Sequence, residues 1–162
     1  MPEVCNQIEM EAPPDAVFRV ISDLDAWPRY LPHYRWIRVL ESHPDYRVVR
    51  MACYRGWIPI DWVSRFHADA SARELHFNHL KAFTRGMHVV WRLESIRHGA
   101  ATRVIITHEL QPVIRRWGRF VAEWIIAGFF IDHVAARTLK GFARHFRSES
   151  RQNPRAPQET RF

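Results

Sequence analysis

The sequence predicts an α+β fold in which one long helix near the C-terminus lies against an antiparallel sheet. Three observations lead to this prediction. Residues 34–111 contain six successive runs with a two-residue period, and no helical stretch separates them. Only short helical segments precede these runs. Residues 115–147 then form one proline-free segment whose apolar side chains recur every three or four residues.

Length and composition predict one ordinary domain. The chain has 162 residues, of which 47% are hydrophobic, and this is enough to form a substantial core. We expect residues 1–147 to form the domain. Residues 148–162 are polar and contain two prolines, and they are expected to be a disordered tail.

The N-terminal residues and the cysteines indicate where the protein functions. The first fourteen residues are polar and lack the apolar segment of a signal peptide. Cys5 and Cys53 do not have the spacing of a metal site. These features predict a cytoplasmic protein with reduced thiols and no disulfide.

The N-terminal part is expected to contain a strand at residues 3–10 and two short helices. Asp15 follows two prolines and is predicted to cap a helix that ends at Ile21 or Ser22. A second helical turn is expected from Asp23, with Pro28 near its first position. The short connectors between the later runs favour antiparallel hairpins. The six predicted strands are residues 34–42, 46–55, 57–68, 73–81, 86–97 and 101–111.

The segment 115–147 predicts a helix about 50 Å long at 1.5 Å per residue. Its first half is apolar almost all the way round, but Glu123 and Asp132 enclose too few residues for a membrane span. Gly128, Asp132 and Leu139 lie on the main apolar stripe, and Asp132 is its one ionisable residue. Asp132 is either bonded to a neighbouring side chain or is a polar group in a ligand cavity.

Alternation along the strands assigns an inner face that is rich in aromatic side chains. Three polar residues accompany them, Tyr34, Ser64 and His108, and we predict these as catalytic residues. A few polar groups among aromatic walls are typical of a pocket for a flat apolar ligand. His108 is either an acid or base or a hydrogen-bonded core residue. The predicted ligand-binding residues are Trp27, Trp36, Trp62, Phe66, Met87, Val89, Trp91, Ile106, Gly128, Asp132 and Leu139.

Other kinds of site find little support in the sequence. The ten histidines show no His-x-x-x-His pattern, and His76 and His79 are expected on opposite faces of one strand, so neither a metal nor another cofactor is predicted. No phosphate-binding loop or nucleic-acid motif is present. Residues 115–147 carry seven basic residues against two acidic ones. Either this is a solvated face, or the basic helix end contacts an anionic membrane or an acidic partner.

Several motifs resemble the START-like, or helix-grip, superfamily. They are APPDAVFRVISDLDAWPRYLP at residues 12–32, WVS at 62–64 and ATRVIITHEL at 101–110. Within that superfamily the chain is most similar to polyketide aromatase/cyclases and cyclase/dehydrases. Coenzyme Q-binding relatives come next, because FFIDHVAARTLKGFARHF resembles their final helix. The resemblance implies a seven-stranded sheet around the long helix, with a ligand cavity between them.

The resemblance implies two functions, and the sequence leaves both open. Aromatase/cyclases have a Trp-x-Ser-x-Arg pattern, in which Trp62 and Ser64 match and Phe66 stands at the arginine position. The first function is aldol cyclisation and dehydration of a poly-ketone, with Tyr34, Ser64 and His108 as the polar groups. The second is non-catalytic binding and transport of a quinone or lipid.

Overall fold

The computed structural model describes residues 4–81, 84–110 and 133–152, and the structural statements below concern these residues. Seven strands alternate with short connectors in the order predicted from the sequence. Each strand begins and ends within two residues of its predicted bounds. The strands are β1 (Val4–Met10), β2 (Tyr34–Ser42), β3 (Arg47–Arg55), β4 (Ile58–Asp69), β5 (Glu74–His79), β6 (Met87–Ile96) and β7 (Ala101–Leu110).

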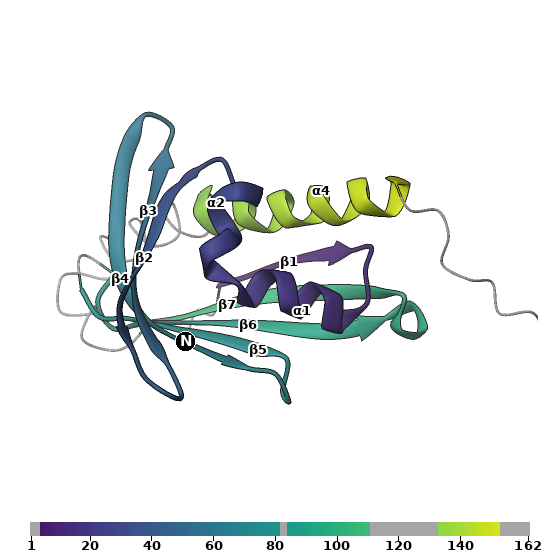
Figure 1. Cartoon of the computed structure of the whole chain (residues 1–162), viewed down its shortest axis with the longest axis horizontal. Coiled ribbons are helices and arrows are strands. Elements are labelled where there is room, and N and C mark those ends of the chain that lie inside the picture. The colour runs from purple at the N-terminus through teal and green to yellow at the C-terminus, as the bar shows by residue number, and fades with distance from the viewer. Residues whose placement is uncertain (1–3, 82–83, 111–132, 153–162) are drawn as a thin grey trace, which may run out of the picture.

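The seven strands form one antiparallel sheet with the order β1-β7-β6-β5-β4-β3-β2. Strands β2 to β7 follow each other as a meander. Strand β1 pairs with β7, and in this pairing Val4 lies opposite His108. Figure 1 shows that the sheet bends strongly, because β2, β3 and β4 stand steeply to β5, β6, β7 and β1. The bend creates a concave side, on which the helices lie.

Two short helices follow β1. Helix α1 (Pro14–Ser22) begins with a proline, whose fixed φ suits the first turn, and α2 (Trp27–Tyr30) also has a proline there. A 3-10 turn, η1 (Leu24–Ala26), joins them. The prediction that Asp15 caps the first helix is wrong. Pro13 is the cap residue, and Asp15 lies in the first turn, where its carboxylate pairs with Arg73 at 3.0 Å.

The described part of the long helix is α4 (Ala136–Gln152), which follows a π-helical turn at residues 133–135. In Figure 1 it lies beside β1 on the concave side of the sheet. The helix continues past Arg147, so the expectation of disorder is wrong for residues 148–152. Ser150 Oγ donates a hydrogen bond of 3.0 Å to the carbonyl of Glu11, which ties this last turn to the domain. The earlier part of the predicted helix, including Gly128 and Asp132, lies outside the described residues.

The apolar side of α4 faces the core as its periodicity predicts. Leu139, Phe142 and Phe146 are buried, whereas Arg144 is exposed. Burial of these side chains against the sheet, rather than helix propensity, provides most of the stability of such a helix. No helix in the described part of the chain is long and apolar enough to cross a membrane.

The start of β2 departs from the predicted alternation. The register shifts between Tyr34, which pairs with Cys53, and Trp36, which pairs with Ala52. An extra residue at such a bulge reverses the face on which the following side chains lie. Tyr34 is therefore buried in the core, while Trp36 lies on the outer face with the guanidinium of Arg38 4.4 Å from its ring centroid. The prediction that Trp36 lies on the inner face, among the ligand-binding residues, is wrong.

Candidate functional site

A cavity of about 40 Å³ lies between the concave face of the sheet and the start of α4. Seven of its lining residues were among the predicted site residues, and these come from α2, β2, β4, β6 and β7. Among the described residues, the lining consists of Trp27, Tyr34, Met51, Trp62, Phe77, His79, Val89, Trp91, Ile106, His108, Val134, Ala135 and Thr138. Hydrophobic and aromatic side chains predominate, and four residues, Tyr34, His79, His108 and Thr138, bring polar atoms.

Trp27 forms the centre of the aromatic wall. Its Nε1 donates a hydrogen bond of 2.8 Å to the carbonyl of Ile21, which fixes the indole against the end of α1. Its ring centroid lies 5.3 Å from that of Tyr34 and 5.5 Å from that of Trp91. Rings at these distances attract each other through edge and offset contacts. A buried hydrogen bond and several ring contacts therefore hold Trp27 in place.

Thr138 on α4 connects three polar groups at one end of the cavity. Its hydroxyl donates a hydrogen bond of 2.6 Å to the carbonyl of Val134. Since the hydroxyl has only one proton, Nε2 of His33, at 3.1 Å, must be the donor in its contact with Thr138. Tyr34 is also hydrogen-bonded to this hydroxyl. Thr138 thus accepts two hydrogen bonds and donates one, which uses its full capacity.

The polar groups at this end are uncharged at neutral pH. Burial, together with the charges of Arg137 and Arg144, lowers the pKa of His33 to about 4. Burial also raises the pKa of the Tyr34 phenol far above its usual value of 10.0. The thiol of Cys53, opposite Tyr34 in the sheet, has its pKa raised to about 12, again by burial.

Two histidines face the cavity from β5 and β7. His79 Nδ1 lies 2.8 Å from the hydroxyl of Thr84, and the His79 ring is parallel to that of Trp62 with centroids 6.1 Å apart. Burial and the nearby charge of His108 lower the pKa of His79 to about 3, so that this imidazole is neutral at pH 7. His108 is also buried, and it pairs with Val89 in the sheet. An imidazole in an apolar site can accept or donate a proton.

Ser64 lies beside the cavity without contributing to its lining. It is fully buried on the inner face of β4, directly opposite His79 in the β4–β5 register. Its Oγ has no hydrogen-bond partner among the described residues. A buried hydroxyl in this state is costly, and a polar ligand atom would remove that cost.

Several other predicted ligand-binding residues do not line the cavity. Phe66, Met87 and Leu139 are buried in the core around it. Phe66 packs against Phe77 with ring centroids 5.0 Å apart, and the Arg47 guanidinium lies 5.6 Å from the Phe66 ring centroid. Trp36 is on the opposite face of the sheet, as described above. Gly128 and Asp132 lie outside the described residues.

Two polar residues of the cavity, His79 and Thr138, were not predicted from the sequence. His79 lies two residues beyond Phe77 on β5, so alternation from Phe77 was the signal that placed it inside. Thr138 precedes Leu139 on the edge of the apolar stripe of α4. It follows Val134 by four residues, the spacing at which a threonine hydroxyl reaches a preceding carbonyl. Neither residue belongs to a short motif.

The arrangement of sheet, helices and cavity defines a class of protein. A bent seven-stranded antiparallel sheet that encloses a C-terminal helix, with two short helices after the first strand, is the START-like, helix-grip fold. Residues 10–134 match the family described as polyketide cyclase / dehydrase and lipid transport. The chain belongs to this family. Among curated proteins, no sequence matches it.

Solved structures with the same fold include aromatase/cyclases. The di-domain aromatase/cyclase BexL from the BE-7585A biosynthetic pathway is 21% identical, with a TM-score of 0.72 over 95% of this chain. The chain spans about half of that protein, 48% of its length. The Zhui aromatase/cyclase from a Streptomyces species is 19% identical, with a TM-score of 0.70 over 98% of this chain and 99% of the other. A START superfamily protein from Mycobacterium smegmatis is 16% identical, with a TM-score of 0.62 over 88% and 97% of the two chains.

Proposed function

We propose that the protein binds a hydrophobic poly-ketone in this cavity and promotes its aldol cyclisation and dehydration. The observation that carries the proposal is the position of two imidazoles, His79 and His108, and one phenol, Tyr34, in a single aromatic cavity. The family to which the chain belongs includes polyketide cyclases and dehydrases, which supports the same chemistry.

The proposed reaction needs two proton transfers in each step. In the cyclisation, a base removes a proton from the carbon between two ketones, and the resulting enolate carbon bonds to a second ketone carbon. The oxygen of that ketone then takes up a proton and becomes a hydroxyl group. In the dehydration, a second proton leaves the neighbouring carbon, and the hydroxyl group departs as water after it is protonated. A positioned acid–base group accelerates such transfers by a factor on the order of 100 to 10,000.

We assign these transfers to His108, with His79 as the neighbouring imidazole that stays neutral at pH 7. The hydroxyl groups of Tyr34 and Ser64 are assigned as donors to ketone oxygens. Ser64 is suited to this role because its hydroxyl has no partner among the described residues. Tyr34 would have to give up its bond with Thr138 to donate to a ligand.

A second candidate function is binding and transport of a quinone or lipid without turnover. This function is favoured because no lysine or arginine is among the described lining residues of the cavity. A cation that stabilises an enolate oxygen would contribute strongly to cyclase catalysis. At the position of the arginine in the aromatase/cyclase pattern, this chain has the buried Phe66.

The size of the cavity adds a requirement to both functions. A volume of about 40 Å³ accommodates about three water molecules, whereas pockets for drug-sized ligands have roughly 300 to 1,000 Å³. A polycyclic or prenylated ligand therefore enters only if wall side chains move. Because Trp27, Trp62 and Trp91 are in this wall, their fluorescence should report binding directly.

The experiment measures binding and turnover in the same set of proteins. We expect quinones and poly-ketones to quench tryptophan fluorescence saturably in the wild type. For the cyclase, His108→Ala should retain this binding but lose cyclisation of a poly-ketone, measured by mass spectrometry of the products. The matched control is His98→Asn, since His98 is exposed and remote from the cavity.

Each outcome separates the candidate functions. Saturable binding with no turnover in the wild type would favour the carrier over the cyclase. Equal turnover in the wild type and in His108→Ala would contradict the assignment of this histidine. Lack of quenching by every quinone, poly-ketone and lipid tested would contradict ligand binding in this cavity.

A further inference from the structure

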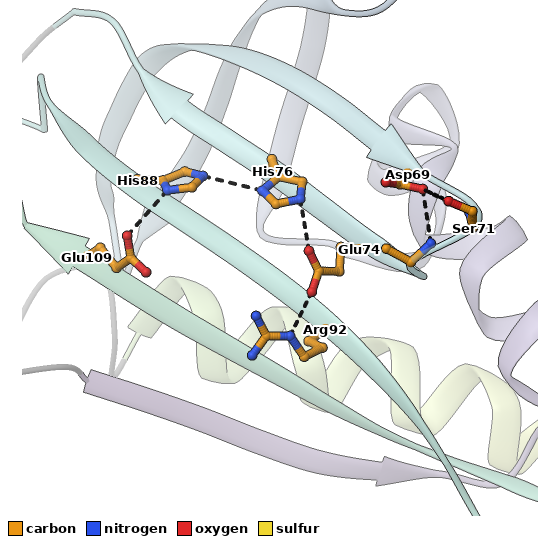
Figure 2. A network of polar contacts seen from close by, with 8 residues as sticks. Asp69, Ser71, Glu74, His76, His88, Arg92 and Glu109 are labelled. Carbon is orange, nitrogen blue, oxygen red and sulfur yellow. Dashed lines mark hydrogen bonds and ion pairs between the residues drawn. The ribbon is translucent and has the colours of Figure 1, made fainter.

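The outer face of the sheet carries a row of histidines and carboxylates on neighbouring strands. Alternation places His76 of β5 and His88 of β6 on this face, opposite the inward-facing Phe77 and Val89. Figure 2 shows the two imidazoles between Glu74 on one side and Glu109 on the other. The row is separated from the cavity by the thickness of the sheet.

The contacts within the row have a regular order. His76 Nδ1 and His88 Nε2 face each other at 3.4 Å. The other nitrogen of each ring faces a carboxylate, His76 Nε2 at 3.1 Å from Glu74 Oε2 and His88 Nδ1 at 3.5 Å from Glu109 Oε2. Arg92 holds the second oxygen of Glu74, with Nε at 2.7 Å from Oε1. Both imidazoles thus have one nitrogen directed at an acceptor and one directed at the other ring.

The two neutral imidazoles have too few N–H groups for all the contacts in the row. The row has three contacts that need a hydrogen, one at each carboxylate and one between the rings, but two neutral imidazoles have only two N–H groups. Carboxylates accept hydrogen bonds and do not donate them, so each ring is expected to direct its N–H at its carboxylate. Two nitrogen lone pairs then face each other at 3.4 Å. One additional proton or a cation can fill this gap between the two nitrogens.

The distance between the two facing nitrogens suits a metal ion. A tetrahedral Zn²⁺ with Zn–N distances of roughly 2.0–2.1 Å holds two ligand nitrogens about 3.3 Å apart, and the two imidazole nitrogens are 3.4 Å apart. Histidines that bind metals almost always donate their other N–H to a carboxylate or carbonyl. Glu74 and Glu109 are placed for this supporting role.

We propose that His76 Nδ1 and His88 Nε2 form a binding site for a divalent cation of the late first transition series, such as Zn²⁺. Imidazole nitrogen is a favoured ligand of these ions. The described residues contain no group of three side chains that could hold a metal, so water completes the coordination. The site lies on the other face of the sheet from the cavity, and its test is independent of the proposed function.

Isothermal titration calorimetry of the full, untagged chain with Zn²⁺ at pH 7.5 tests the proposal. We expect one high-affinity site per chain in the wild type. His76→Ala and His88→Ala should each weaken Zn²⁺ binding by at least about tenfold, since one ligand cannot chelate. Glu74→Gln removes the carboxylate that orients His76 and should weaken binding by about tenfold.

The control variant is His98→Asn, which removes an exposed histidine outside the row. His98 has a φ of 55°, a conformation that asparagine tolerates, so this variant should fold and bind Zn²⁺ as the wild type does. The side chains of His76 and His88 are each 26% exposed, and circular dichroism should confirm that their alanine variants fold. Electron paramagnetic resonance with Cu²⁺ should in addition show two nitrogen ligands, and one in each alanine variant.

Two results would overturn the proposal. The first is a Zn²⁺ affinity that is the same in the wild type, His76→Ala and His88→Ala. The second is a wild type that binds no Zn²⁺, in which case the gap holds a proton shared by the two rings.

Discussion

Removal of two buried hydroxyl groups near the cavity should change the free energy of unfolding in opposite directions. Ser64 and Thr138 are both fully buried, but Ser64 Oγ has no partner among the described residues, whereas Thr138 has three. Burial of an unpaired polar group costs about 1–3 kcal/mol. We therefore expect Ser64→Ala to raise the free energy of unfolding by about 1 kcal/mol. For a chain of this length, such a change raises Tm by roughly 2–4 °C.

Thr138→Val is the matched variant, because valine has nearly the shape of threonine and lacks only the hydroxyl. It removes the acceptor of His33 and Tyr34 and the donor to the Val134 carbonyl. At about 1 kcal/mol for each hydrogen bond, the loss is about 3 kcal/mol. The corresponding decrease in Tm is roughly 6–12 °C.

Urea denaturation and calorimetry of the two variants measure these effects. A shift in the urea midpoint without a change in the m-value would identify a change in stability alone. If Ser64→Ala destabilises the protein by 1 kcal/mol or more, the serine hydroxyl has a partner and is not available as a donor to a ligand. If Thr138→Val is neutral, the hydrogen bonds at this threonine do not stabilise the fold.

Three further predictions test the packing and the titration of buried groups. Leu139→Asp should lower stability by about 4 kcal/mol or more, because Leu139 is buried and would be replaced by an unpaired charge. Arg144→Asp on the exposed side of α4 should be nearly neutral, and equal melting temperatures for the two would contradict the helical phase. Gly141→Ala should be destabilising by about 1–3 kcal/mol in thermal melts, because the added methyl would collide with the buried side chain of Leu31; a gain in stability would show that Leu31 moves aside. The pKa values of His33 and His79 are lowered from 6.5 to about 4 and about 3. Below pH 6.5 the unfolded chain thus binds more protons at these two histidines than the folded chain does. Their contribution to the free energy of unfolding is fully present above that pH and is lost as the pH decreases towards 4. His33→Gln should flatten this decline by up to about 1.4 kcal/mol per pH unit, and an unchanged slope, as expected for His98→Asn, would contradict it.

The sequence predicted the sheet well because each strand shows its own periodicity. Apolar and polar residues alternate in β4, β6 and β7, and this pattern is independent of the neighbouring strands. The same alternation placed Trp62, Trp91 and His108 on the inner face. The fold therefore followed from local patterns, together with motifs similar to those of the superfamily.

The parts that the sequence did not predict depend on relations between elements. The bulge after Tyr34 moves Trp36 to the outer face, and no composition signal marks a shift of register. Thr138 belongs to the site because its helix places it beside His33 and Tyr34, which are more than 100 positions earlier in the chain. The facing nitrogens of His76 and His88 likewise result from the pairing of β5 with β6. Spacing along one segment contains no information of this kind.

The pairing of β1 with β7 has a consequence for the order in which the protein folds during synthesis. β1 is the first strand to leave the ribosome, yet its partner begins only at Ala101. At roughly 5–20 residues per second, β1 waits about 5–20 s for this partner, whereas a hairpin forms in about 1–10 μs. The meander from β2 to β6 therefore has time to form first. A nascent chain that ends before Ala101 has a β1 strand without its native neighbour, and the closure of the sheet is the last and most non-local of its strand pairings.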